Sequence, residues 1–234
     1  MSTGIVLAIV IGGTVLLLGA VAAFVIWIKR SFVGRAEVSV DALREEAARR
    51  GWTFVERDDS MVALYDRQYD RRSWWEPLTQ PPRAKGARDV ITGTHRGRPF
   101  VAATFDTVYQ GQHQPERAIW VAAPAPHPML SIHRVAGTQN ALNRSIGLGG
   151  VQTGNVEFDR RFEVLSEDER FAHAVLSPQL QEFLLTDPRS FRGVYLRGEY
   201  LDVLDPVQDH RNPDELVAAL DLRCDILDRI PAWS

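Results

Sequence analysis

The sequence contains a single cysteine, Cys224, among its 234 residues, so no disulfide can form within one chain. Charge of one sign is also lacking, because 27 Lys and Arg side chains stand against 30 Asp and Glu and give a formal net charge of −3. Such a chain has no general electrostatic attraction for nucleic acid. With 45% hydrophobic and 24% charged residues, the composition is that of a folded globular protein. We therefore expect a folded protein that binds no nucleic acid.

Recognisable catalytic and cofactor motifs are missing as well. The six histidines do not form the H-x-H or H-E-x-x-H spacings that hold zinc. Residues 147–154 are rich in glycine, but Gln152 stands where the phosphate-binding pattern has its last glycine, which favours a flexible connection. Cys224 lies on an apolar helical stripe, where a thiol is expected to be buried and inert. The sequence predicts no catalytic residue, no cofactor and no metal site.

A long uncharged run is the clearest feature that is present. Residues 4–28 carry no charge, and their length exceeds the roughly 20 apolar residues that span a bilayer. No basic start precedes the run and no small-residue cleavage site closes it, which argues against a cleaved signal peptide. The sequence therefore predicts a transmembrane helix over 4–28, a juxtamembrane linker over 29–38 and a soluble domain over 39–234.

The distribution of basic residues predicts the direction of this helix. Lys29, Arg30 and Arg35 follow the run, and no positive side chain precedes it. By the positive-inside rule, the residues after the span lie in the cytoplasm and the N-terminus lies outside. We expect a single-pass protein of the cell membrane with the bilayer as its first partner.

Small residues form a stripe along one face of the predicted span, at Ala8, Gly12, Gly19 and Ala23. Such a stripe permits close packing against another membrane helix, either in a homo-oligomer or in a complex with a membrane-protein partner. The alternative is that small residues are simply common in membrane spans.

The remaining chain alternates between strand and helix patterns. Strands are expected at 52–54, 61–65, 119–123, 129–135 and 158–164, and hairpins at 89–94 with 100–109 and at 191–196 with 200–204. Helices are expected after Ser39, after a capping box at Ser166, after Ser177 and after Asn212. Three prolines, Pro124, Pro126 and Pro128, indicate a sheet edge or an irregular crossover. Together these patterns predict one α+β domain with helices packed on a mostly antiparallel sheet.

The segment from Arg67 to Arg88 is locally basic and aromatic. Its candidate contact residues are Arg71, Arg72, Trp74, Trp75, Arg83 and Lys85. Beside a membrane, these side chains suit anionic lipid headgroups, and they equally suit the surface of a partner protein. A third interpretation is that the tryptophans hold a long loop against the core.

Three stretches carry a resemblance to a known group of proteins: DVITG and HRGRPF within 89–100, FDRRFEV at 158–164 and ILDRIP at 226–231. Together they resemble a family of uncharacterised actinobacterial single-pass membrane-anchored proteins. The excess of arginine over lysine suits the high-GC genomes of that group. The resemblance implies no catalytic residue, cofactor or substrate.

Two functional hypotheses follow. The first is a non-enzymatic binding or accessory module that contacts a partner protein or the membrane surface. The alternative is a hydrolase whose polar residues converge only in the folded chain. A deep pocket with clustered acidic or histidine side chains would favour the hydrolase, whereas a flat or filled surface would favour binding.

Overall fold

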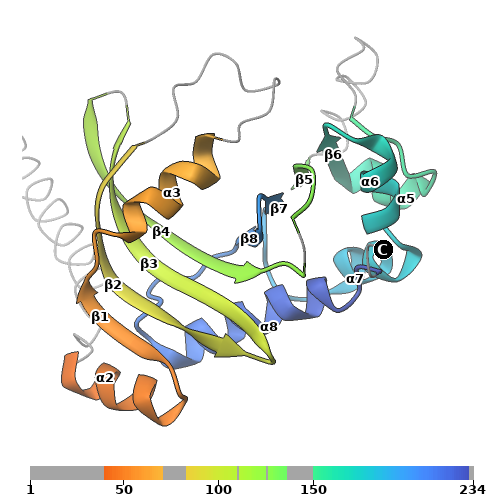
Figure 1. Cartoon of the computed structure of the whole chain (residues 1–234). Helices are drawn as coiled ribbons and strands as arrows, with labels where there is room; N and C mark the ends of the chain where they lie inside the picture. Colours follow the sequence, from red (N-terminus) through yellow and green to blue (C-terminus); the bar gives the residue numbers. More distant parts are fainter. Residues whose placement is uncertain (1–39, 71–82, 110, 125, 136–149, 232–234) are drawn as a thin grey trace, which may run out of the picture. The chain divides into compact units, whose positions relative to one another are not determined.

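The computed structural model describes residues 40–70, 83–109, 111–124, 126–135 and 150–231. Its strands are β1 (Thr53–Arg57), β2 (Arg83–His95), β3 (Arg98–Tyr109), β4 (Gln112–Ala122), β5 (Leu130–Arg134), β6 (Phe162–Ser166), β7 (Gly193–Arg197) and β8 (Tyr200–Leu204). Its helices are α2 (Val40–Arg49), α3 (Met61–Asp70), α5 (Val156–Arg161), α6 (Glu169–Val175), α7 (Pro178–Thr186) and α8 (Pro213–Leu227). The strands form one sheet (Figure 1).

The sheet is antiparallel throughout, in the order β1-β2-β3-β4-β8-β7-β5-β6. Helices pack on it, which confirms the predicted α+β class. Both predicted hairpins are present, as β2 with β3 and β7 with β8. The first turns at Arg96 and Gly97, which both have positive φ, as a tight hairpin turn requires.

The connection from β4 to β5 passes over two strand positions, and the β7–β8 hairpin fills the space between them (Figure 1). The predicted crossover at residues 124–128 is therefore confirmed. Because β7 and β8 come late in the chain, the centre of the sheet joins early and late segments. Residues around this junction are consequently brought together from distant parts of the sequence.

Strand alternation gives the sheet two distinct faces. Tyr195 lies opposite Asp202, and Asp202 lies opposite Trp120, so these side chains share one face. Helix α3 covers part of that face, where Tyr65 packs against Phe105 and Trp120. Helix α8 packs against β4 and β8 from the other face (Figure 1).

One predicted strand is wrong, and another begins later than predicted. Residues 61–65 belong to helix α3, because Met61, Tyr65 and Tyr69 recur at helical spacing and the two tyrosine hydroxyls both donate to Glu116 of β4. Phe158 belongs to helix α5 rather than to a strand, since the Asn155 side chain accepts from its amide and caps the helix. The strand predicted over 158–164 begins only at the end of α5.

The predicted helix starts are mostly confirmed. The Ser177 side chain caps α7 and the Asn212 side chain caps α8, each ahead of a proline in the first turn. The capping residue of α6 is Asp168 rather than the predicted Ser166. Helix α2 ends shortly before Gly51, whose φ of +70° suits the end of a helix.

Within the described ranges, no helix is both long and apolar enough to cross a bilayer. The predicted span over 4–28 and the linker over 29–38 lie outside the described residues. The same is true of the small-residue stripe at Ala8, Gly12, Gly19 and Ala23.

Candidate functional site

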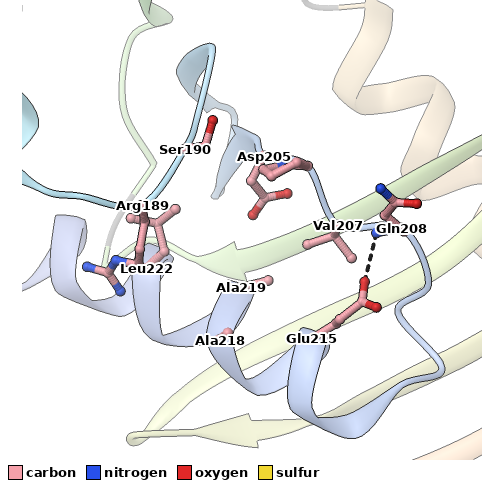
Figure 2. Close-up of a pocket in the computed structure, with 10 residues that line it drawn as sticks. Arg189, Ser190, Asp205, Val207, Gln208, Glu215, Ala218, Ala219 and Leu222 are labelled. Carbon is pink, nitrogen blue, oxygen red and sulfur yellow. Dashed lines mark hydrogen bonds between the residues drawn. The ribbon is translucent and has the colours of Figure 1, made fainter.

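A groove runs along the N-terminal half of helix α8, on the α8 side of the sheet (Figure 2). Its volume is about 340 Å³, and it is lined by Arg189, Ser190, Asp205, Pro206, Val207, Gln208, Glu215, Ala218, Ala219 and Leu222. A second hollow of about 310 Å³ shares Ser190, Asp205 and Pro206 with it. The two hollows therefore lie side by side across a common rim.

The loop between β8 and α8 forms one wall of the groove. The Glu215 carboxylate accepts hydrogen bonds from the backbone amides of Gln208 and Asp209, at 2.8 and 3.1 Å, which folds the loop back over the first turn of α8. Arg117 of β4 donates to the Val207 carbonyl at 3.2 Å and fixes the same wall to the sheet. The wall is thus held at both of its sides.

The floor of the groove is apolar. Ala218 is exposed and Ala219 is buried, and Leu222 continues the same surface of α8. Two successive alanines leave the space that larger side chains would fill. Val207 and Pro206 supply apolar surface from the opposite wall. This combination suits burial of an apolar group from another molecule.

The charged side chains around the groove are already paired within the chain. Arg189 donates to Asp187 and to Asp225, with Nη2 to oxygen distances of 2.7 and 2.8 Å. The hydrogen bond from Arg189 holds the pKa of Asp187 below its ordinary value. Glu215 is occupied by the backbone amides of the wall. Each of these groups thus already has a hydrogen-bond partner within the chain.

Asp205 is paired with Arg223, which is only 1% exposed. The Arg223 guanidinium lies between β4 and β8, at the point where the two strands stop pairing. The ladder between β4 and β8 ends at the pair Trp120–Asp202. Beyond it, Arg223 donates to the carbonyls of Ile119 and Val203, at 2.7 and 2.8 Å, in place of the missing ladder bonds.

The remaining Arg223 donors are also satisfied. Its Nη1 donates to the Asp205 carboxylate at 2.6 Å and to the Ala219 carbonyl at 2.9 Å. Asp202 lies 3.7 Å from its Nη2. All five N–H donors of a guanidinium therefore have a partner or a nearby countercharge. Arg223 thereby holds Asp205, which lines the groove.

The described lining offers few groups for catalysis, since none of its residues is a histidine or a cysteine. Cys224 is fully buried, as predicted, and burial raises the pKa of its thiol. Among the described residues, no three His, Cys, Asp or Glu side chains are grouped so that they would hold a metal ion.

The predicted basic and aromatic segment, Arg67 to Arg88, begins in α3 and ends in β2. The residues between these two elements, 71–82, are not described by the structure. Arg71, Arg72, Trp74 and Trp75 lie outside the described residues. Arg83 and Lys85 are exposed at the start of β2, and Arg83 lies 3.7 Å from Asp66 of α3. Neither residue lines the groove.

Sequence reasoning missed both Arg223 and the groove. The residues predicted to form the apolar stripe of α8 are buried or half-buried, but the helix also buries Arg223 beside Cys224. An arginine within a helix surface that is otherwise apolar is the one indication that the sequence offers. Its partners come from β4 and β8, which the sequence does not place beside it.

Comparisons with known proteins assign no family. No protein-family model matches the chain, and no curated protein matches it. Among solved structures, it is similar to the crystal structure of the mycobacterial trehalose monomycolate transport factor A, TtfA, with 13% sequence identity and a TM-score of 0.46. That alignment covers 82% of this chain and 96% of the other.

Proposed function

We propose that this chain is a non-enzymatic binding module whose groove beside α8 takes an apolar segment of a partner protein. One observation carries the proposal: an apolar floor is bordered by charged groups that are all paired within the chain. An apolar centre with a polar rim is the usual composition of a protein-binding surface. The module acts as an accessory to its partner.

The hydrolase alternative receives no support from this groove. Hydrolysis requires a nucleophile or an activated water beside a general base. Ser190 is the only hydroxyl in the described lining, and no histidine lies in that lining to activate it. The acidic side chains Asp205 and Glu215 hold Arg223 and the groove wall instead.

An extended segment of a partner suits the shape of the site. Arg189 and Glu215 lie toward opposite ends of the groove, with Ala218 and Ala219 between them (Figure 2). The adjoining hollow of about 310 Å³ provides a second space across the shared rim. Two neighbouring hollows can each receive an apolar side chain of one extended peptide.

Photo-crosslinking of the full chain in cells tests this proposal. A benzophenone amino acid replaces Ala218, which is exposed in the groove, and in a control it replaces Ala174, which is exposed on α6. We expect an adduct with the same apolar peptide of one partner protein from position 218 only. A lipid adduct from 218, or the same adducts from both positions, would overturn the proposal.

A matched pair of substitutions supplies a second measurement. Ala218→Arg places a long charged side chain in the groove, whereas Ala174→Arg makes the same change outside it. We expect Ala218→Arg to reduce binding of the crosslinked peptide at least tenfold, with little change in the melting temperature. Unchanged affinity in Ala218→Arg would contradict the groove as the binding site.

We further propose that the module is anchored by residues 4–28 and faces the cytoplasm. The uncharged run and the basic residues that follow it support this arrangement. A reporter that is active only in the cytoplasm, fused after Ser234, should be active in membrane fractions. An active reporter in the soluble fraction alone would contradict the anchor, and an inactive fusion present in the membrane would contradict the direction.

A further inference from the structure

Arg197 lies at the end of β7, on the face of the sheet that carries α3. Its guanidinium carbon is 4.5 Å from the ring centroid of Tyr195 and 5.4 Å from that of Tyr69. The Arg197 side chain is therefore held by cation–π contacts with tyrosines from two different elements. Such contacts satisfy none of the N–H donors along the edge of the guanidinium, which still need acceptors.

That edge has no acceptor among the described residues. The Nε of Arg197 is buried and makes no hydrogen bond. No carboxylate of the described residues lies within ion-pair distance of this side chain, in contrast to Arg223. A buried N–H without a partner costs free energy, so its retention indicates that something else supplies the acceptor.

A small cavity adjoins this arginine. It is lined by Gln68, Tyr69, Trp120, Arg197, Tyr200 and Asp202, and its volume is about 10 Å³. Such a volume is close to the least that holds one water-sized atom. The cavity thus has room for a single oxygen atom beside the guanidinium.

Asp202 brings a carboxyl group to the same cavity. Burial raises its pKa above the ordinary value, although Arg223 and Arg197 oppose that effect. A carboxyl with a raised pKa carries a proton more readily and can donate a hydrogen bond. The cavity therefore combines an arginine edge with an acid that is able to share a proton.

We propose that this cavity is a binding site for a small carboxylic acid. One carboxylate oxygen occupies the cavity and accepts from Arg197 Nε, while the other accepts from a terminal N–H of the same guanidinium. This is the bidentate geometry that arginine forms with planar carboxylates. The ligand and Asp202 share one proton, as neighbouring carboxyl groups do.

A carboxylate fits this site better than a phosphate. Either group can place only one oxygen in the cavity, and the remaining atoms of a planar carboxylate need less room beside it than those of a tetrahedral phosphate. The charge of Asp202 also disfavours a doubly charged ligand more than a singly charged one. The cavity and the groove share no lining residue, and Arg223 connects them, since it lies 3.7 Å from Asp202 and donates to Asp205.

NMR of the full chain in detergent, labelled with ¹⁵N-arginine, tests the site through the Nε–H resonance of Arg197. The probes are sodium acetate, sodium phosphate and sodium chloride at equal ionic strength. We expect a saturable shift of this resonance with acetate, at an affinity at least tenfold above that for phosphate. Chloride should leave it unchanged, and the exposed Arg170 of α6 should not respond to any probe.

Three results would overturn the proposal. The first is no acetate-dependent shift, which would leave the cavity as a water site. The second is an equal response to chloride, or an equal response of Arg170, which would indicate general screening. The third is tighter binding of phosphate than of acetate, which would place the ligand in another chemical class.

Variants separate binding from folding. Arg197→Met should abolish the acetate response, measured by calorimetry, and Arg197→Lys should weaken it at least tenfold because lysine lacks the planar fork. Asp202→Asn, which removes the competing charge, should bind acetate at least as tightly as the unsubstituted chain. Retained binding in a folded Arg197→Met protein, or its loss in a folded Asp202→Asn protein, would contradict the proposed geometry.

Discussion

Arg223 and Arg197 occupy opposite sides of the same sheet and differ in what surrounds them. Arg223 is 1% exposed, and it reaches three backbone carbonyls and two carboxylates. Arg197 contacts two aromatic rings and finds no hydrogen-bond acceptor among the described residues. The first arginine replaces missing sheet hydrogen bonds, whereas the second keeps its donors free. Arginine thus stabilises the fold at position 223, whereas at position 197 its donors are available to bind a ligand.

This comparison explains how the two faces can have separate roles. Around the groove, the charged side chains are already bound to other groups of the chain. The apolar surface is therefore what the groove offers to a partner. At the α3 face, the absence of pairing leaves a polar contact for a small acid. The balance of acceptors around each arginine distinguishes the two roles.

The largest expected effect comes from Arg223→Met. Removing this guanidinium leaves Asp205 as a buried charge and orphans the carbonyls of Ile119, Val203 and Ala219. We expect the free energy of unfolding to fall by about 3–5 kcal/mol. Urea denaturation followed by circular dichroism measures this change, and Arg170→Met, at an exposed site, should stay within about 0.5 kcal/mol of the unsubstituted protein. Equal losses in both variants would remove the special role of Arg223.

A smaller effect is expected from the same substitution at Arg197. Methionine preserves the apolar contact with Tyr69 and Tyr195, and the loss is limited to cation–π attraction of about 0.5–1 kcal/mol. The same urea titration measures it in the absence of added carboxylate. A loss as large as that of Arg223→Met would show that Arg197 is a structural residue and would break the comparison.

The smallest effect concerns His210. This side chain is buried like Arg223, but it has one acceptor, whereas Arg223 has five acceptor groups around it. Its Nε2 lies 2.7 Å from the Asp89 carbonyl, and its Nδ1 finds no partner in the part of the chain that the structure describes. Burial lowers the pKa of His210 below 6.5, with Arg117 acting in the same direction and Asp89 and Asp209 opposing it. The unfolded chain therefore takes up the proton first, and stability falls as the pH drops below about 6.5.

His210→Gln tests this pH dependence, because glutamine can donate to the same carbonyl without titrating. Urea midpoints at pH 7.5 and pH 5.5 should differ more in the unsubstituted chain than in the variant. Comparing the two proteins at each pH cancels the contribution of the carboxyl groups that both retain. An unchanged pH dependence in His210→Gln would show that His210 does not titrate in this range.

Local patterns predict much of the fold. Turn chemistry at Arg96 and Gly97, and the caps at Ser177 and Asn212, act within a few residues and are visible in the sequence. The sequence predicts a strand at the start of α3 because the first five residues of this helix are apolar and suit either structure. Its helical conformation is stabilised by Tyr65 and Tyr69, whose partner Glu116 is 51 and 47 residues away.

The groove and the cavity cannot be predicted from local patterns, because each depends on contacts between segments that are distant in the sequence. Arg223 binds carbonyls of β4 and β8 only because the late β7–β8 hairpin lies beside β4. Arg197 ends β7 and contacts Tyr69 of α3, which packs on the same face of the sheet. No local pattern specifies either neighbour. The predicted contact residues Arg71, Arg72, Trp74 and Trp75 and the membrane span remain predictions.

The place of the β7–β8 hairpin also determines when this domain can finish folding. Strands β4 and β5 leave the ribosome well before the hairpin that separates them in the sheet. At about 5–20 residues per second, synthesis exposes the facing edges of both strands for several seconds. Unpaired edges of this kind readily join other chains. The nascent protein therefore depends on a rapid arrival of its last third, and slowed translation after β5 should increase aggregation.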